Sequence, residues 1–515
     1  MNRLLRILQF VVIAVLLIAE GASASNITVS NISIVQRNDA SKYAVVQFDV
    51  TWDYGFRNGT GGLENWDAAW VFLKFQKVGN EAMGFYHGTL SAATNHTIPT
   101  GFTGTQPTDN KGIFLYRSAT GNGTTTITGV KLRWEYGADG VDLTTNVNLK
   151  VFATEMVYVP TSSFWVGDES DNETYPFGNG GLPDTYNNPF KITSEAAITP
   201  ANANGSFWAY GGNYMNTTVI PAAYPKGYGA FYCMKHEITQ KAYVDFLNTL
   251  NRVQQGNMVN TGGIATATSV TNRYVMCNSA SMTYRNGIRC DATLPAAPTP
   301  ATFYCDYDGD GVPNAATDGL SIACGYLGWI NISSYLDWAG LRPMTEMEFE
   351  KAARGPVYPT PGEYAWGTST YTTLTGLTDA GKATETASNA GANCNFLYSG
   401  PVRVGFATTS TSTRAQSGAG YWGITELSGN LFDFCVSSYA EGRSFTGING
   451  DGTLDANGYC NVANWPTTSG NGSAWRGSDC QRNFPNACIS DRNWGYITGN
   501  NMGWQMGGRG VRTAP

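Results

Sequence analysis

The sequence predicts an N-terminal all-β sandwich followed by an irregular α+β domain. Only 14% of its 515 residues are charged, whereas long amphipathic helices need many Lys and Glu residues. Gly, Trp and Tyr are abundant, with 61, 14 and 28 residues, a balance that favours sheets, turns and ordered loops. Strand-like alternation in the first third and two helical stretches further along complete the pattern.

Residues 1–24 have the pattern of a secretory signal peptide. Arg3 and Arg6 precede an apolar stretch at 7–19, and the small residues 22–24 offer a cleavage site. The apolar stretch is too short for a comfortable transmembrane helix, and no later stretch reaches about 18 apolar residues. We therefore expect an exported protein, secreted or at the cell surface, with no transmembrane segment after signal removal. An uncleaved anchor is the alternative.

The overall charge argues against one class of partner. The formal net charge is −7, and the mature chain has no run of Lys and Arg. Binding to a phosphate backbone needs a basic face. We therefore expect no nucleic-acid partner.

Residues 25–150 are expected to form the β-sandwich. Apolar and polar residues alternate at 43–52 and again at 130–134, as they do in strands with one buried face. Asn-Gly and Gly-Gly pairs near 58–62 and 121–123 mark turns between such strands. No catalytic constellation stands out in this part of the chain.

Residues 151–515 are expected to form the second domain, with a Thr-, Asn- and Ala-rich insertion at 251–325. Thr239 is suited to cap a helix at its N-terminus. The apolar residues that follow it recur at helical spacing as far as Leu250. Helix content beyond this segment and one further helix is expected to be small.

A second helix is predicted after Thr345, which with Glu348 forms a capping box. Glu346 and Glu350 then lie four residues apart on one helix face, and Arg354 extends that face. Paired carboxylates can do acid–base chemistry, but a solvated or salt-bridged face is the interpretation that we favour.

Ten cysteines follow residue 230, and none precedes it. Because an exported chain meets oxidising conditions, this pattern predicts disulfides in the second domain. The sequence does not give their pairing.

A calcium loop is predicted within the insertion. Asp306, Asp308 and Asp310 place carboxylates at alternate positions, a glycine follows, and Val312 would offer a backbone carbonyl at the seventh position. The usual Glu at the twelfth position is missing, and Asp318 follows one place later. A solvated acidic turn is the alternative.

A broken series of short motifs runs through the final third of the chain. The motifs are Arg-Pro-Met-Thr-Glu at 342–346, Phe-Glu-Lys-Ala-Ala-Arg-Gly at 349–355, Tyr-Ala-Trp-Gly at 364–367, the stretch 423–433, Trp-Arg-Gly-Ser at 475–478 and the ending 507–512. This order of motifs resembles the formylglycine-generating enzyme (sulfatase-modifying factor) family. The resemblance covers residues 152–515 apart from the insertion, and it implies a C-type-lectin-like fold. This family includes copper oxidases and proteins that keep the scaffold without the chemistry.

The resemblance implies a second calcium site. Carried over to this chain, Glu426 and Asp433 would supply side-chain oxygens, and Gly429 and Leu431 backbone carbonyls. A turn held by ordinary hydrogen bonds is the alternative.

The resemblance also raises copper chemistry. In the catalytic members, two cysteines with four residues between them bind Cu(I) after a motif like that at 475–478, and soft thiolates suit this ion. Here Cys480 and Cys488 have seven residues between them. A disulfide is the more common role for such cysteines, so the spacing argues against copper. Non-haem iron and Ser-His-Asp chemistry need placed histidines, and the chain has only three.

The stretch 479–506 is rich in Asn, Gly and aromatic residues, a composition that supplies contact area at low entropic cost. The resemblance implies that this region faces a ligand, and it extends to the variable receptors of diversity-generating retroelements. Loops packed under aromatic lids are the alternative. The candidate ligand-binding residues are Phe484, Asn486, Asn493, Trp494, Tyr496, Asn501 and Trp504.

These observations favour an exported, non-catalytic, calcium-stabilised module that binds an unknown protein or glycan through the 479–506 surface. The alternative is a copper-dependent oxidase that converts a sulfatase cysteine to formylglycine, with Cys480 and Cys488 as its catalytic residues. A purely structural envelope protein is a third hypothesis, which leaves the aromatic surface unexplained.

Overall fold

The structure is a computed structural model that describes residues 27–59, 63–170, 173–181, 188–209, 217–396, 398–483 and 485–515. The predicted signal peptide and Phe484 lie outside these described residues. No helix in the described ranges is long and apolar enough to cross a membrane.

The first layer of the N-terminal part is a three-stranded antiparallel arrangement in which β2 pairs with both β1 and β7. Burial alternates along β2, so that Val46, Phe48 and Val50 face the core while their neighbours are more accessible. The alternation that predicted a strand at 43–52 therefore places one face inward. The bounds are β1 (Thr28–Asn38), β2 (Tyr43–Asn58) and β7 (Gly121–Trp134).

The second layer is centred on β3, which is buried on both faces along almost its whole length. The ring of Phe75 packs against Trp134 of the first layer, with centroids 5.1 Å apart. On the opposite face, the rings of Phe72 and Trp338, the last residue of helix α3 (Trp329–Trp338), pack edge to face with centroids 5.2 Å apart. The strands of this layer are β3 (Asn65–Lys77), β4 (Tyr86–His87), β5 (Phe102–Thr105), β6 (Ile113–Arg117) and β8 (Val147–Val159).

Strand β8 crosses the predicted domain boundary at 150/151. It pairs with β3 on one side, from Asp67↔Val157 to Lys77↔Val147. On its other side it pairs with β13 (Phe231–Met234), which in turn pairs with β22 (Val511–Thr513) near the end of the chain. One ten-stranded sheet therefore runs through both predicted domains.

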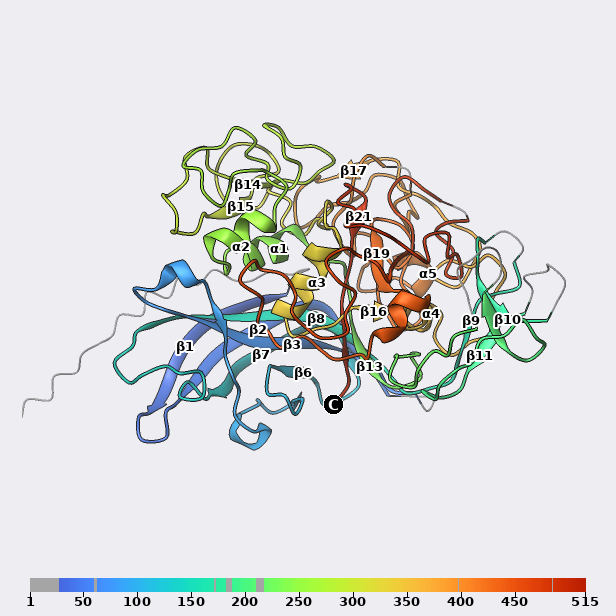
Figure 1. The fold of residues 1–515 in the computed structure, drawn as a ribbon, viewed down its shortest axis with the longest axis horizontal. Coiled ribbons are helices and arrows are strands. Elements are labelled where there is room, and N and C mark those ends of the chain that lie inside the picture. The colour runs from blue at the N-terminus through green and yellow to red at the C-terminus, as the bar shows by residue number, and fades with distance from the viewer. Residues whose placement is uncertain are drawn as a thin grey trace, which may run out of the picture.

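The helices are few and short, as predicted, and α1 and α3 cover the sheet (Figure 1). Thr239 caps α1, and Thr345 with Glu348 forms the predicted capping box of α4. The bounds are α1 (Gln240–Leu247), α2 (Arg252–Asn257), α3 (Trp329–Trp338), α4 (Glu346–Arg354) and α5 (Arg414–Ser417), with 3-10 turns at Glu81–Met83, Ala93–Asn95 and Ala440–Ser444.

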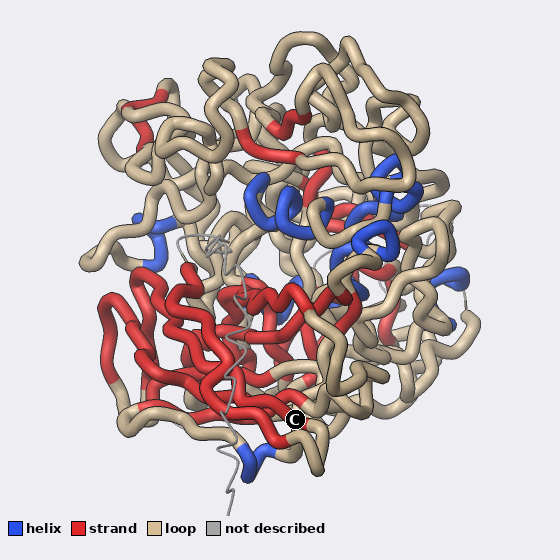
Figure 2. The backbone as a smooth tube through the Cα atoms, turned by 90° about the vertical axis from the view of Figure 1, so that its left-hand side faces the viewer, coloured by secondary structure: helices blue, strands red, loops and turns tan. Residues whose placement is uncertain are grey.

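Loops make up most of the second half, whereas the strands concentrate in one region (Figure 2). A small sheet formed by β16, β19, β20 and β21 carries several of the family-like motifs. The remaining strands are β9 (Phe164–Val166), β10 (Phe177–Asn179), β11 (Phe190–Ile192), β12 (Phe207–Ala209), β14 (Ile288–Cys290), β15 (Phe303–Cys305), β16 (Met344–Thr345), β17 (Leu377–Thr378), β18 (Thr386–Ala387), β19 (Phe432–Val436), β20 (Ser473–Arg476) and β21 (Met506–Gly507).

Candidate functional site

The predicted salt-bridged face of α4 is buried. Arg492 binds Glu346 through two parallel contacts of 2.8 and 2.9 Å. Arg476 of β20 donates to Glu350 at 2.8 Å, and Arg354 donates to the other oxygen of Glu350 at 3.0 Å. Burial alone would raise the pKa of Glu346, but Arg492 and Arg476 outweigh it and lower that pKa. Both carboxylates are therefore paired with arginines inside the protein, and this face of α4 is salt-bridged, not solvated.

Cys480 and Cys488 have different surroundings. The backbone of Cys480 donates to Asn430 O at 2.9 Å, whereas the Cys488 thiol contacts Gly362 O at 3.5 Å. Burial, and then the charge of Asp479, raises the pKa of Cys480. Burial also raises the pKa of Cys488, next to other buried acids. Neither environment stabilises a thiolate.

All ten cysteines lie among the described residues, and the structure forms no disulfide between them. The predicted disulfides are therefore not seen. Burial raises the pKa of all ten thiols, including those of the half-buried cysteines. In these surroundings the cysteines behave as small apolar core residues with weak donors.

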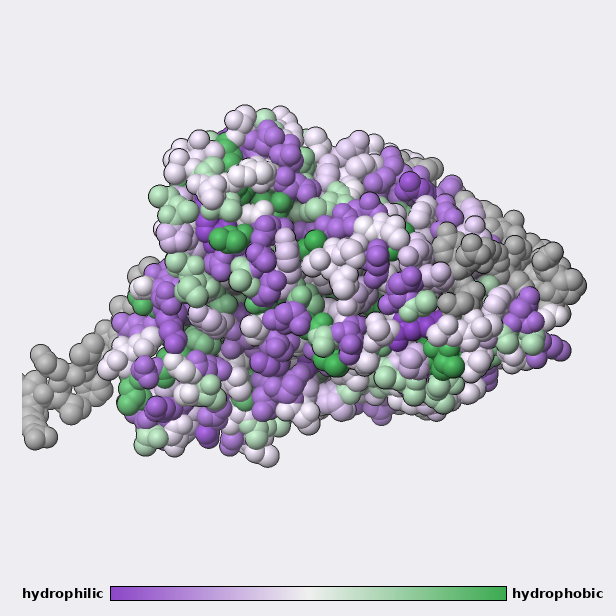
Figure 3. Space-filling view, in the orientation of Figure 1, coloured by the Kyte–Doolittle hydropathy of each residue, from purple (hydrophilic) through white to green (hydrophobic). Residues whose placement is uncertain are grey.

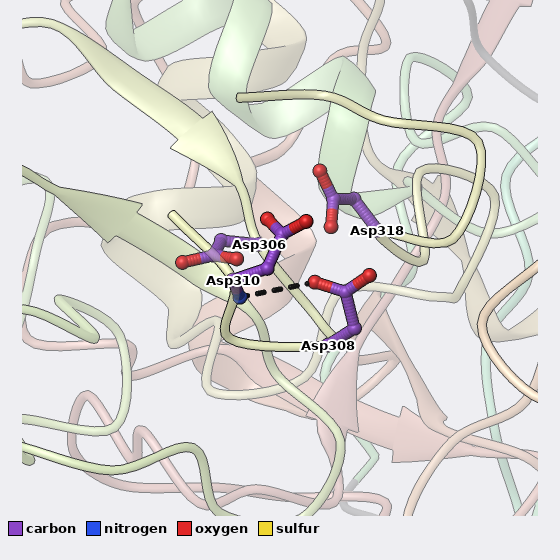
Figure 4. Close-up of side chains that lie close together, drawn as sticks. All are labelled: Asp306, Asp308, Asp310 and Asp318. Carbon is purple, nitrogen blue, oxygen red and sulfur yellow. Dashed lines mark hydrogen bonds between the residues drawn. The ribbon is translucent and has the colours of Figure 1, made fainter. Parts of the chain in front are cut away.

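The predicted calcium loop brings its carboxylates together, as Figure 4 shows. Asp306, Asp308 and Asp310 lie with Asp318 in a group whose ligand atoms are all within 4.8 Å of one another. Gly311 has a φ of +82°, which lets the chain turn back behind the third carboxylate.

Asp318 is the member that completes this group. It lies one place beyond the twelfth position of the loop and is fully buried. Its Oδ1 has no hydrogen-bond partner within the described chain, while Oδ2 accepts from Ala315 N. Burial, together with the charges of Asp308 and Asp310, raises the pKa of Asp318 to about 6. A cation would relieve this repulsion.

One protein cation already reaches the group, because Arg289 forms an ion pair with Asp306. The other carboxylates accept hydrogen bonds from the loop itself. Asp308 accepts from Asp310 N at 3.1 Å, and Asp310 accepts from Val312 N at 2.7 Å. Four acids and one arginine leave an excess of negative charge, which suits a divalent ion with oxygen ligands.

The second predicted calcium set is engaged by protein groups. Both oxygens of Asp433 accept from Arg509 Nε, at 3.0 and 2.9 Å, and the same guanidinium donates to Glu426 O at 2.9 Å. The Glu426 carboxylate accepts from Gly405 N at 2.7 Å. Leu431 N donates to a buried glutamate at 2.9 Å. Among the described residues, Glu426 and Asp433 belong to no cluster of three metal-ligating side chains.

The candidate ligand surface is partly accessible. Of the residues predicted for it, Asn501 is exposed, and Asn486, Asn493, Trp494, Tyr496 and Trp504 are half-buried. Trp494 packs its edge against Phe432 at 4.9 Å, with the Arg482 guanidinium 5.4 Å from its ring centroid. Trp494, Tyr496 and Trp504 each contact a neighbouring aromatic ring while part of the side chain stays accessible.

The chemical character of the visible face is mixed. In Figure 3 apolar residues are scattered among polar ones, with no large continuous apolar area. Scattered apolar residues of this kind need no partner to cover them.

A buried charge network that the sequence reasoning missed joins the two halves. Lys235, just after β13, donates to Asp67 of β3 at 3.0 Å and to Glu155 of β8 at 2.5 Å. His236 lies 3.6 Å from Glu155 and 3.6 Å from Glu426. Only strand pairing brings these residues together, so no spacing in the sequence could have indicated them.

The network favours a charged histidine. Burial opposes the protonated form of His236, but Glu155 and Glu426 outweigh this effect and raise its pKa. For Asp67, by contrast, burial itself raises the pKa to about 6, although Lys235 opposes the change. The other two histidines of the chain, His87 and His96, lie among the N-terminal strands and bind Lys111 O and Gln106. No set of histidines suited to a metal is assembled in the described residues.

The family model of the sulfatase-modifying factor enzyme 1-like domain matches residues 150–503. No curated protein matches the chain. The matched range begins within β8, the strand that the two halves of the molecule share.

Proposed function

Since the chain belongs to the sulfatase-modifying factor enzyme 1-like family, we propose that its family domain is a non-catalytic, calcium-stabilised module. It binds or displays a ligand outside the cell through the 479–506 surface. The proposal includes export by the N-terminal segment and a protein or glycan as the ligand.

The observation that carries the non-catalytic proposal is the state of the cysteines. Copper(I) binds thiolates, whereas burial raises the pKa of both Cys480 and Cys488. The Cys480 backbone N–H donates to Asn430 O, whereas the Cys488 thiol contacts Gly362 O, so the two residues lie against different segments. Two protonated thiols in separate surroundings are poorly suited to hold one linear Cu(I) ion.

Partial exposure of anchored aromatic rings supports the ligand surface. Trp494 and Trp504 each keep some accessible area while a neighbouring ring fixes their position. Rings already held in place lose little conformational entropy when a ligand binds. This part of the molecule therefore offers contact area to a ligand at a low cost in conformational entropy.

The calcium ion would be held by Asp306, Asp308, Asp310 and Asp318, with Val312 supplying a carbonyl as the loop spacing predicts. Bound there, the ion would neutralise the excess charge of the carboxylates. The residues fit the ion because Asp318 is fully buried and has an oxygen without a partner in the described chain. Its role would be structural, since it would hold together residues 306–318 within the insertion.

A Cu(I) titration of the reduced protein with a competing chelator tests the non-catalytic proposal. The wild type, Cys480→Ser and, as a control, Cys460→Ser should compete equally weakly. The oxidase alternative, which family membership favours, requires tight one-to-one binding that Cys480→Ser loses and Cys460→Ser keeps. That result would overturn the proposal and direct attention to cysteine peptides of sulfatases as substrates.

The ligand surface is tested by a capture experiment. Purified wild type is screened against glycan and extracellular-protein arrays. Trp494→Ala, Tyr496→Ala and Trp504→Ala should each reduce capture of the ligand found, without a change in the melting temperature. Tyr358→Ala, which removes an exposed tyrosine elsewhere, should not. If capture survives all three substitutions, the ligand does not bind through the 479–506 surface.

A further inference from the structure

A cavity of about 320 Å³ lies between the two halves of the molecule, and the proposed function gives it no role. Strands β2 and β7 contribute one wall, and the segment 408–423, which includes α5, contributes the other. Its volume is at the small end of the range of about 300–1,000 Å³ in which ligand pockets fall. Residues on its accessible rim are Tyr54, Asn58, Asn122, Thr409, Ser410 and Tyr421.

Two buried polar atoms of the lining residues have no hydrogen-bond partner in the described part of the chain. They are Thr408 Oγ1 and Arg414 Nε. Most buried polar atoms in proteins are satisfied, and each exception calls for an explanation. Thr408 and Arg414 thus leave two hydrogen-bonding positions that the described chain does not fill.

Two tyrosines present their rings at the rim. Tyr421 is 40% exposed and Tyr54 is 39% exposed. Tyr54 also has a φ of +53°, a conformation that is rare for a bulky residue and often marks a functional position. The Arg414 guanidinium lies 5.6 Å from the centroid of the Tyr421 ring and helps to fix it.

The lining is polar but carries no acid. Among the described residues that line the cavity, none is Asp or Glu. Lys235, which is among the lining residues, is already paired with Asp67 and Glu155. Arg414 donates to two backbone carbonyls and has no carboxylate within ion-pair distance in the described chain. Hydroxyl and amide groups, which both donate and accept, supply most of the remaining polarity.

We propose that this cavity between the halves binds a saccharide. The edge of a sugar ring carries hydroxyls that need donors and acceptors, which Thr408, Ser410 and Asn122 can provide. Its C–H face is apolar and packs well against an aromatic ring such as that of Tyr421. The site is separate from the 479–506 surface. It gives the N-terminal strands a part in recognition, since they build one wall.

Ligand-observed NMR by saturation transfer tests the proposal on the full chain. The probes are the methyl glycosides of glucose, galactose, mannose and N-acetylglucosamine, with methyl glucuronide as an acidic counterpart. We expect saturation transfer to at least one probe, and an affinity at least tenfold weaker in Tyr421→Ala and in Thr408→Val. Tyr358→Ala and Thr375→Val change exposed residues elsewhere and should bind as the wild type does.

Thr408→Val separates a binding role from a structural one. It removes a buried hydroxyl that has no partner in the described chain, so the melting temperature should stay the same or rise while binding weakens. The inference is overturned if no glycoside gives saturation transfer, or if neither cavity variant weakens binding. Loss of binding in Trp494→Ala with full binding in Tyr421→Ala would also overturn it and would place the sugar on the other surface.

Discussion

The rings of Tyr284 and Trp504 are stacked, with centroids 4.0 Å apart and planes only 4° from parallel. Tyr284 belongs to the insertion and is 44% exposed, whereas Trp504 belongs to the candidate ligand surface. The insertion and the C-terminal segment are thus joined at a point accessible to solvent. The insertion therefore contributes to that surface.

This stack predicts energetic coupling. In a double-mutant cycle, Tyr284→Ala and Trp504→Ala should show a coupling energy of about 0.5–1.5 kcal/mol, the range for aromatic pairs. Urea unfolding followed by fluorescence measures it. If the effects of the two substitutions on the free energy of unfolding are additive, the stacked rings contribute no coupling energy.

Calcium should stabilise the chain. An ion present at a hundred times its Kd adds about 2.7 kcal/mol to the free energy of unfolding. The melting temperature should therefore rise with Ca²⁺ and fall again with a chelator. Asp318→Asn should abolish the rise because it removes the buried ligand, whereas Asp142→Asn, which changes an exposed acid, should keep it. Equal shifts in both variants would rule out this site.

The stability of the shared sheet should depend on pH through His236. Its pKa is raised in the folded protein, so the folded state holds the proton more tightly than the unfolded chain does. The stabilisation is complete below the ordinary value of about 6.5 and is lost as pH rises through the folded pKa. Wild type should therefore lose more stability than His236→Gln on going from pH 6 to pH 9. Parallel pH profiles would contradict this.

The buried ion pairs of α4 should be intolerant of single substitutions. Arg476→Met leaves Glu350 with one cation fewer in a fully buried position. Breaking such a pair typically costs about 3–5 kcal/mol. A denaturant titration should show this loss. Lys382→Met breaks an accessible pair with Asp379, so it should leave the unfolding midpoint unchanged.

A cut at 150/151 should not release two stable domains. Residues on both sides of this position belong to β8, which pairs with β3 and with β13. Fragments 25–150 and 151–515 would each expose unpaired strand edges and apolar surface. We expect both to be insoluble or aggregated when expressed alone, as judged by size-exclusion chromatography. A folded, monomeric fragment would show that the shared sheet is dispensable.

Local features were predicted well because they depend on neighbours in the sequence. Thr239 caps α1, and Thr345 with Glu348 caps α4, as the capping patterns indicated. The strand predicted at 43–52 lies within β2. The loop spacing placed Asp306, Asp308 and Asp310 in one group. Each of these outcomes is set by backbone geometry over a few residues.

Features that depend on distant segments were missed. Strand β3 is buried on both faces, so it lacks the alternation that identified β2. Asp433 is paired with Arg509, 76 residues further along the chain. No pattern in the sequence could have indicated that this guanidinium lies where we expected calcium. The disulfides predicted from the number of cysteines are also not formed in the structure.

The sequence by itself determined the β-rich beginning, the short capped helices, the acidic loop and the resemblance to a family that the match at 150–503 confirms. Only the tertiary structure decided that one sheet unites both halves, that Lys235 and His236 meet Asp67 and Glu155, and that a cavity opens beside them. The reason is physical. Hydrogen bonds within a turn act between neighbours, whereas strand pairing and the burial of charge join residues far apart in the chain.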